Sequence, residues 1–344
     1  MKTTGRIEWL VVGVLAVSTF LLGACRTKEE MNYSTDPVDN IEALWRIIDT
    51  RYCYVEDKGI DWSAIRDEYV QKASLIPKDD QVALFDLCAG MLDSLRDGHV
   101  ALYTAFDRAS NTAWFDTFPA NYNTALQRLY LKDYRIAGSL YYCTIDDENI
   151  GYVYYSSFRD AVSAGNLYWV FKAFEHCRGL VIDVRNNGGG DMTNSFRLSS
   201  PFFTADETIG YWKHKTGTGH HDFSALEPLT TDAALCPVKW QKPVVVLCNR
   251  RTYSAANLFV NIMRYAPNAC IIGGTSGGGG GVPMSHEMPN GWMVSFSSVR
   301  MYDREKKDIE NGIEPDVKVT LTSSDKDDII EEAVRHINQW PSGK

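Results

Sequence analysis

Two runs of β-branched residues place the strongest constraint on the fold of this chain. GLVIDVR (residues 179–185) and PVVVLC (residues 243–248) lack the polar alternation of a strand with one exposed face. Helical stretches follow them, TNSFRLSSPF after the first and SAANLFVNIMRYA after the second. Strands buried on both faces that alternate with helices are typical of a parallel sheet covered by helices. Residues 149–344 are therefore predicted to form an α/β core that ends in a helix.

The residues before the core divide into two segments. Residues 38–98 contain VDNIEALWRIIDTRY and DQVALFDLCAGMLDSL, and their apolar residues recur at helical spacing. This segment is predicted to be a helical N-terminal cap. Residues 99–148 carry short aromatic and β-branched runs, such as HVALYTAF and LYYCTI, between polar turns. Such runs predict a small β segment between the cap and the core.

The first 25 residues are predicted to be a secretory signal rather than part of the fold. Lys2 and Arg6 precede the apolar run WLVVGVLAVSTFLLGA, which ends at Cys25. The sequence LLGAC resembles the lipobox of bacterial lipoproteins, in which the cysteine is lipidated and becomes the N-terminus. An ordinary signal peptide with a chance cysteine is the alternative. With residues 26–37 as a tether, the lipobox predicts an extracytoplasmic protein anchored in the bacterial cell envelope, at the outer membrane, facing the periplasm or the surface.

Charge and cysteine content exclude several classes of partner. The formal net charge is −9 and there is no dense block of lysine and arginine, so a nucleic-acid partner is not expected. Of eight cysteines, seven follow Cys25 at wide spacings without a CxxC pair. They predict mostly free, buried thiols with at most one disulfide, rather than a zinc or redox site.

Three histidines in the irregular stretch 214–235 could be read as a metal site. They are His214, His220 and His221. Adjacent histidines cannot easily face one ion, and the chain has no HExxH motif. A solvated loop is the better interpretation, and neither a metal nor another cofactor is expected.

The glycine-rich turn NNGGGD follows the strand at 179–185 and is a candidate binding loop. Gly189 and Gly190 let the backbone approach a ligand closely with its N–H groups exposed. One interpretation is an oxyanion hole that stabilises a developing negative charge. The alternative is a flexible turn between a strand and a helix.

Ser254 follows the second buried strand, at the predicted start of a helix. The exposed N–H groups and the dipole of a helix N-terminus favour an anion there, which suits a nucleophilic serine. The N–H of Ala255 would then add to the oxyanion hole. The alternative is a helix N-cap, the commonest role of serine at this position.

His99 begins a strand after a glycine turn, in LRDGHVAL. A nucleophilic serine needs a base within hydrogen-bond distance, and an imidazole can provide it. The alternative is an exposed or capping histidine.

Six motifs taken in order resemble one family, the C-terminal processing (tail-specific) serine peptidases. The motifs are DGHVAL, IGYVYYSSF, VIDVRNNGGG, VVVLCNRRTYSAANLF, IIGGTSGGGGG and NGIEPDVKV, and they cover roughly residues 95–320. The resemblance implies a ClpP/crotonase-like α/β core. It also implies that Ser254 is the nucleophile and that the glycines 188–190 with Ala255 form the oxyanion hole.

The resemblance leaves two possibilities for the general base, and the sequence selects one of them. Tail-specific proteases use a lysine in the glycine loop, at a place matching Gly278 or Gly279, but no lysine occurs between Lys242 and Lys306. The tricorn-like branch uses a histidine oriented by a glutamate. His99 matches the histidine and Glu310 the glutamate.

Three further positions qualify this assignment. Glu314 is a rival to Glu310, which could also be an ordinary turn carboxylate. Gly98 occupies the place of a further serine in tricorn, so a triad rather than a tetrad is predicted. Asn257 stands where these enzymes usually carry glutamate.

The implied function is that of a serine endopeptidase without a PDZ domain. Only about fifty residues separate His99 from Ile150, fewer than the tail-binding PDZ module needs. The expected substrate is a peptide or protein tail, cleaved through an acyl-enzyme without a cofactor, and the oligomeric state stays open. The alternative is a catalytically silent ligand- or peptide-binding lipoprotein on the same fold.

Overall fold

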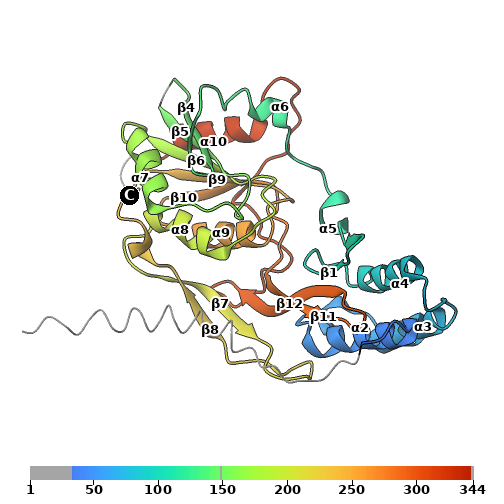
Figure 1. Ribbon diagram of the computed structural model, residues 1–344. Helices are drawn as coiled ribbons and strands as arrows, with labels where there is room; N and C mark the ends of the chain where they lie inside the picture. The colour runs from blue at the N-terminus through green and yellow to red at the C-terminus, as the bar shows by residue number, and fades with distance from the viewer. Residues whose placement is uncertain (1–32, 148, 342–344) are drawn as a thin grey trace, which may run out of the picture.

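The computed structural model describes residues 33–147 and 149–341. The predicted signal, Cys25 and most of the tether lie outside the described residues. None of the described helices is long and apolar enough to cross a bilayer. Figure 1 shows an α/β part, in which helices cover a sheet, joined by long strands to a part dominated by the N-terminal helices.

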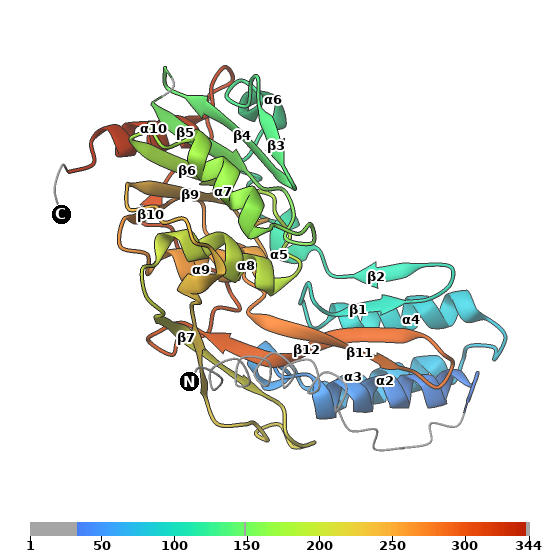
Figure 2. The ribbon, with the colours of Figure 1, turned by 60° about the vertical axis from the view of Figure 1, so that its left-hand side comes forward.

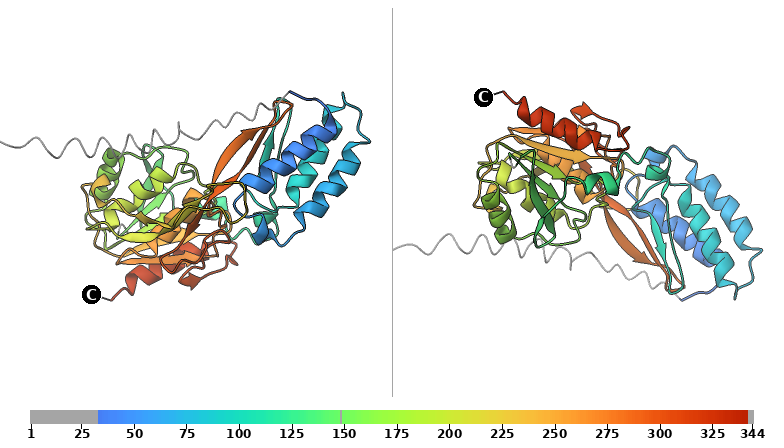
Figure 3. Two further views of the ribbon diagram at one scale, coloured as in Figure 1. Left: turned by 90° about the horizontal axis from the view of Figure 1, so that it is seen from below. Right: turned by 90° about the horizontal axis from the view of Figure 1, so that it is seen from above.

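Three helices form the N-terminal cap: α2 (Pro37–Arg51), α3 (Trp62–Ala73) and α4 (Gln81–Asp93). Each begins after an aspartate whose side chain accepts a hydrogen bond from an amide of the first turn. Their apolar faces bury Leu44 and Met91 against Phe296 of strand β12 (Met293–Tyr302). Figure 3 shows the three helices side by side along the long strands.

A six-stranded antiparallel sheet connects the cap to the core. Its order is β2-β1-β12-β7-β8, with β11 paired to β12 outside this path. The other strands are β1 (Ala101–Tyr103), β2 (Arg108–Ser110), β7 (Thr208–His214), β8 (Glu227–Thr230) and β11 (Gly281–Glu287). Strand β12 pairs with β1, β7 and β11, so it joins strands that lie far apart in the sequence (Figure 2).

The core is a seven-stranded sheet in the order β13-β10-β9-β6-β5-β4-β3. Strands β5, β6, β9, β10 and β13 are parallel, as predicted, and β3 and β4 add an antiparallel edge. The strands are β3 (Arg135–Ala137), β4 (Leu140–Ile145), β5 (Ile150–Tyr154), β6 (Gly179–Asp183), β9 (Val244–Cys248), β10 (Ala269–Gly273) and β13 (Val317–Lys318).

Helices cover both faces of this sheet. Helices α7 (Ala164–Ala173), α8 (Met192–Ser199) and α9 (Ala255–Met263) bury one apolar cluster, and α10 (Asp328–Asn338) buries another on the opposite face. Because β6 and β9 pack on both sides, their residues are fully buried without alternation. The predicted α/β fold class is confirmed.

Residues 99–148 do not form a separate small β unit. Strands β1 and β2 extend the six-stranded sheet, whereas β3 and β4 extend the seven-stranded one. A two-stranded hairpin has too little core to be stable alone. Each hairpin therefore joins the sheet edge that it can reach, and the segment is divided between two sheets.

The cysteines agree with the prediction of mostly free, buried thiols. Burial raises the pKa of the Cys88 and Cys248 thiols to about 12, so both stay protonated and unreactive at neutral pH. The buried free thiols include Cys53, Cys88, Cys236, Cys248 and Cys270, and Cys143 is half-buried.

A buried ion-pair triad fastens α10 to the sheet. Arg185 is fully buried just after β6, and its Nη2 lies 2.6 Å from Asp183 Oδ2. Its Nη1 donates to Asp327, 2.9 Å away, which is also the N-cap of α10. Removing one member of such a group leaves uncompensated charges in the interior.

Arg185→Met should therefore lower the free energy of unfolding by about 3–5 kcal/mol, because Asp183 and Asp327 lose their cation. Thermal melts of the two proteins would measure the loss. Arg335→Met is the matched control, since Arg335 lies on α10 itself but pairs with Glu332 in an exposed position. Equal melting temperatures for wild type and Arg185→Met would contradict this role of the triad.

Candidate active site

Ser254 lies in a strained turn between β9 and α9. Its backbone has φ 57° and ψ −121°, a region that residues other than glycine seldom adopt. The turn is held because the Ser254 N–H donates to the Gly278 carbonyl at 2.8 Å and Tyr253 forms a bridge with the same glycine. Such strain persists only where surrounding structure fixes it, which is common at functional sites.

The Ser254 side chain makes no capping hydrogen bond to α9. Its Oγ lies instead 3.0 Å from Nε2 of His99, a residue 155 positions earlier in the chain. The helix-cap alternative therefore does not describe this serine. The structure brings together the two side chains that the sequence singled out as nucleophile and base.

His99 contacts Asp97 at the end of the cap, Tyr253 in the turn before α9, and Ser297 on β12. The backbone N–H of His99 donates to Asp97 Oδ1 at 2.7 Å, and the imidazole ring packs on Tyr253 with the ring centroids 4.8 Å apart. Nδ1 lies 3.3 Å from Oγ of Ser297 on β12. Burial lowers the pKa of His99, opposed by the negative charge of Asp97. The neutral imidazole, which can accept a proton, is therefore favoured.

An aromatic stack explains the glycine before His99. Trp114, on the short helix α5 (Ala113–Asp116), stacks on Tyr253 with the ring centroids 4.0 Å apart. A Cβ at Gly98 would lie 2.4 Å from Trp114 Nε1. A serine side chain at position 98 would therefore displace the tryptophan, which agrees with the predicted absence of a fourth group there.

Glu310 lies in the loop between β12 and β13, with one oxygen shielded from solvent. Its Oε2 is buried and has no hydrogen-bond partner among the described residues, while the Gly280 amide contacts the carboxylate. Burial, and then the negative charge of Asp97, raises its pKa well above the ordinary value. The side chain also lines a cavity of about 580 Å³, together with Tyr54 and Lys58.

The two candidate glutamates have very different surroundings. Glu314 is exposed and pairs loosely with Lys318, with Nζ and Oε2 3.8 Å apart. Glu310 is half-buried with its Oε2 shielded from solvent, and no hydrogen bond between Glu310 and His99 is present in the described part of the chain. Of the two, only Glu310 has the buried position that an orienting carboxylate needs.

Asn257 supports the loop that carries Glu310. It is fully buried on α9, and its Nδ2 donates to the carbonyl of Ile309 at 3.1 Å. Its Oδ1 accepts from Ser276 Oγ at 2.6 Å, and Ser276 Oγ in turn accepts from the amide of Ile313 at 2.7 Å. The amide provides the donor and the acceptor that this network requires, which a glutamate carboxylate could not do.

The glycine run 277–281 packs against the same loop. A Cβ at Gly278 would lie 1.9 Å from the carbonyl oxygen of Glu310, and one at Gly279 2.5 Å from the Tyr253 ring. A lysine at either position is sterically incompatible with this packing. The backbone thus agrees with the sequence in excluding a lysine base at the matching place.

The glycine-rich turn after β6 lies against Ser254. A Cβ at Gly189 would be 2.8 Å from both Ser254 Cβ and the Ala255 nitrogen. The Gly189 N–H donates to Asn187 Oδ1 at 2.9 Å and is therefore already engaged. The amides of Gly190 and Ala255 take part in no hydrogen bond of the described residues, so both remain available to a ligand.

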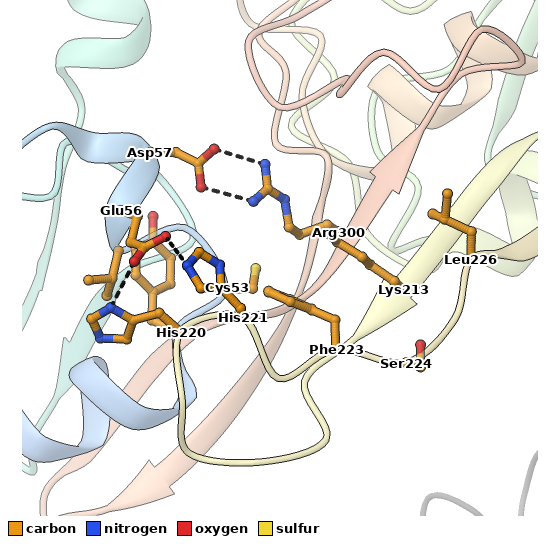
Figure 4. Close-up of a pocket in the computed structure, with 12 residues that line it drawn as sticks. Cys53, Glu56, Asp57, Lys213, His220, His221, Phe223, Ser224, Leu226 and Arg300 are labelled. Carbon is orange, nitrogen blue, oxygen red and sulfur yellow. Dashed lines mark hydrogen bonds and ion pairs between the residues drawn. The ribbon is translucent and has the colours of Figure 1, made fainter.

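A second cavity, of about 440 Å³, lies between the β7–β8 connection and the cap (Figure 4). In it, Glu56 lies between His220 and His221, and Asp57 faces Arg300. None of the candidate catalytic residues lines this cavity. Residues 33–147 and 149–341 gather no group of three side chains able to hold a metal ion.

The sequence did not single out Ser297 and Asp97, which contact His99, or Trp114, which packs beside Gly98 and Tyr253. Ser297 is one of three serines in SFSS and lies 198 residues from His99, so no local pattern marks it. Asp97 did carry a signal, because it precedes the candidate base by two residues. Trp114 lies in the segment between the two hairpins and had no periodicity to assign it.

Two family models match the chain. The model described as peptidase family S41 matches residues 149–319, and the tricorn protease C1 domain matches residues 37–93. Carboxy-terminal processing protease CtpA of Bacillus subtilis is 28% identical over 183 residues, which are 52% of this chain and 37% of that protein. This chain therefore spans only about a third of the curated relatives that it matches first.

Solved structures extend the comparison over almost the whole chain. A protein from Parabacteroides merdae described as a candidate peptidase is 41% identical with a TM-score of 0.83, covering 90% of this chain and 98% of that one. Mature CPAF has a TM-score of 0.67 at 12% identity, covering 89% and 98%, and shares the fold. The sequence resemblance to the tail-specific and tricorn-like peptidases is thus confirmed, and the chain belongs to peptidase family S41.

Proposed function

We propose that this chain is a serine endopeptidase that cleaves peptides or protein tails through an acyl-enzyme. In the proposal Ser254 is the nucleophile, His99 the general base and Glu310 the carboxylate that completes a triad. The observation that carries it is the contact of 3.0 Å between Ser254 Oγ and His99 Nε2, made by a serine held at positive φ that does not cap its helix.

The chemistry follows from these positions. Ser254 Oγ attacks the scissile carbonyl while His99 Nε2 takes its proton, and the carbonyl oxygen becomes an oxyanion. The amides of Gly190 and Ala255, together with the N-terminus of α9, would stabilise that charge. His99 then gives the proton to the leaving amine, and a water activated by the same imidazole hydrolyses the acyl-enzyme.

The proposed substrate class rests on the relatives of this chain. The Bacillus subtilis relative is named a carboxy-terminal processing protease, and this supports protein tails as substrates here. The mechanism needs no cofactor. We also retain the proposal of an extracytoplasmic protein anchored through lipidated Cys25, which rests on the LLGAC sequence outside the described residues.

A fluorophosphonate probe tests the proposal without knowledge of the substrate, because it phosphonylates only an activated serine. The full chain should be labelled, the adduct should map to Ser254 by peptide mass spectrometry, and Ser254→Ala should not react. Folding of both proteins is checked by circular dichroism. A well-folded wild type that stays unlabelled would contradict the proposal and favour a silent binding protein.

A further inference from the structure

The contact on the far side of the His99 ring is unusual for a proposed serine–histidine–glutamate triad. For Nε2 to accept the Ser254 proton, the neutral ring must carry its hydrogen on Nδ1, and that N–H needs an acceptor. In the described part of the chain, the side chain facing Nδ1 is Ser297, with Oγ at 3.3 Å. Glu310, the expected acceptor, makes no hydrogen bond there.

The neighbouring carboxylate of Asp97 is already engaged. Its Oδ1 accepts from the His99 amide at 2.7 Å, and its Oδ2 accepts from the Tyr52 hydroxyl at 2.6 Å and lies 3.9 Å from Lys58 Nζ. Asp97 therefore holds the backbone of His99 rather than its ring. Among the described residues, Ser297 is then the hydrogen-bonding side chain that can orient the ring through Nδ1.

Ser297 is placed for this contact by its strand. It is fully buried in β12, and its carbonyl accepts from the Cys53 amide at 2.9 Å. The pairing of β11 and β12 shifts register between Val282 and Pro283, beside this residue. Across the pair, a Cβ at Gly281 would lie 2.3 Å from Ser297 Oγ, so the glycine leaves the space that the hydroxyl fills.

Unsatisfied hydrogen-bonding groups connect Ser297 to Glu310. When Ser297 Oγ accepts from Nδ1–H, its own O–H still needs an acceptor, and Glu310 Oε2 is a buried acceptor without a donor. Glu310 and Ser297 each contact one of two consecutive glycines. The Gly280 amide contacts the Glu310 carboxylate, and Gly281 faces Ser297. A buried donor or acceptor left unpaired lowers stability, and a hydrogen bond from the Ser297 hydroxyl to Glu310 would satisfy both groups.

We propose that Ser297 is a positioning residue that accepts the Nδ1–H of His99 and donates its hydroxyl toward Glu310. The orienting group of the base is then a serine and a glutamate in series. The serine comes from β12 because Trp114 fills the space beside Gly98. This inference rests on the proposed serine-peptidase function and adds a residue to its site.

The test compares Ser297→Ala with Ser295→Ala in the full chain, by the rate of fluorophosphonate labelling from pH 5 to pH 9. Ser295 is a buried serine of the same strand whose hydroxyl takes part in no hydrogen bond of the described residues, so its removal costs similar packing. Ser297→Ala should label about 10-fold to 100-fold more slowly, the value of one hydrogen bond to a charged group. The pH at which the labelling rate first rises to half its plateau should also fall, because the His99 imidazolium loses a hydrogen-bond acceptor.

A proton NMR spectrum of the downfield region provides a second measurement. The Nδ1–H resonance of His99 should be present in wild type, absent in His99→Gln, displaced in Ser297→Ala and unmoved in Ser295→Ala. Ser297→Ala with the rate, midpoint and resonance of wild type would overturn the inference while leaving the proposed function intact. A wild type that is never labelled at Ser254 would overturn both.

Discussion

Replacing His99 with glutamine should slow fluorophosphonate labelling of Ser254 by about 10⁴-fold or more, the usual cost of losing the base of a serine–histidine pair. Glutamine keeps an amide near Ser254 Oγ but cannot take its proton at neutral pH. The reaction would then depend on hydroxide and on the oxyanion donors alone. The rate of labelling at fixed probe concentration measures the effect.

The same experiment has a pH dependence with a defined sign. Burial lowers the pKa of His99 from its ordinary 6.5, and Asp97 only partly opposes this shift. Labelling requires the neutral ring, so the rate should rise with pH through a first midpoint below 6.5, and His99→Gln should lack this rise. His176→Gln is the control, because its side chain is 91% exposed and pairs with Glu175 far from the proposed site in the sequence. A midpoint above 6.5, or a first rise that survives in His99→Gln, would contradict the assignment of His99 as base.

The parts of this site that sequence could predict are those encoded by local patterns. Ser254 and the glycine turn lie at the ends of parallel strands, where a sheet of this class gathers its functional groups. In the structure β6 and β9 are adjacent parallel strands, so the turns that follow them bring Gly189 close to Ser254. His99 was predicted through its motif, DGHVAL, and not through any physical period in the chain.

The parts that sequence could not predict depend on register between distant strands. Ser297 faces His99 only because β12 pairs with β1 at one register and with β11 through an irregularity. A slip of one residue would turn this serine away. The division of residues 99–148 between two sheets is a similar case, because the free edge that each hairpin meets is set by strands from elsewhere in the chain.

Two residues that the proposed chemistry needs have energetically unfavourable local structure. Ser254 adopts a strained backbone, and Glu310 places an acceptor in the interior without a donor. Natural chains tolerate such violations mainly at functional sites, where stability is lost for activity. Replacing the buried Glu310 carboxylate with a neutral group should therefore raise or preserve stability while lowering activity.

Glu310→Gln should label about 10²-fold to 10⁴-fold more slowly than wild type, yet be at least as stable to heat. The glutamine keeps the shape but not the charge that would stabilise the His99 imidazolium. In wild type, a second rise in rate, at a pH above the ordinary 4.5 of a glutamate, should appear as Glu310 ionises, because burial and Asp97 raise its pKa. Glu310→Gln should keep the first rise and lack the second.

Stability should change in the opposite direction, with a pH window set by the same shift. The pKa of Glu310 is raised in the folded state above its ordinary 4.5, so its contribution to folding is lost as pH rises past 4.5 toward the folded value. The glutamine variant escapes this loss, and its higher melting temperature should vanish in acid. Glu314→Gln, which removes an exposed carboxylate four residues away, should change neither rate nor melting. If Glu310→Gln labels at the wild-type rate, Glu310 is an ordinary turn carboxylate and the triad fails at its third member.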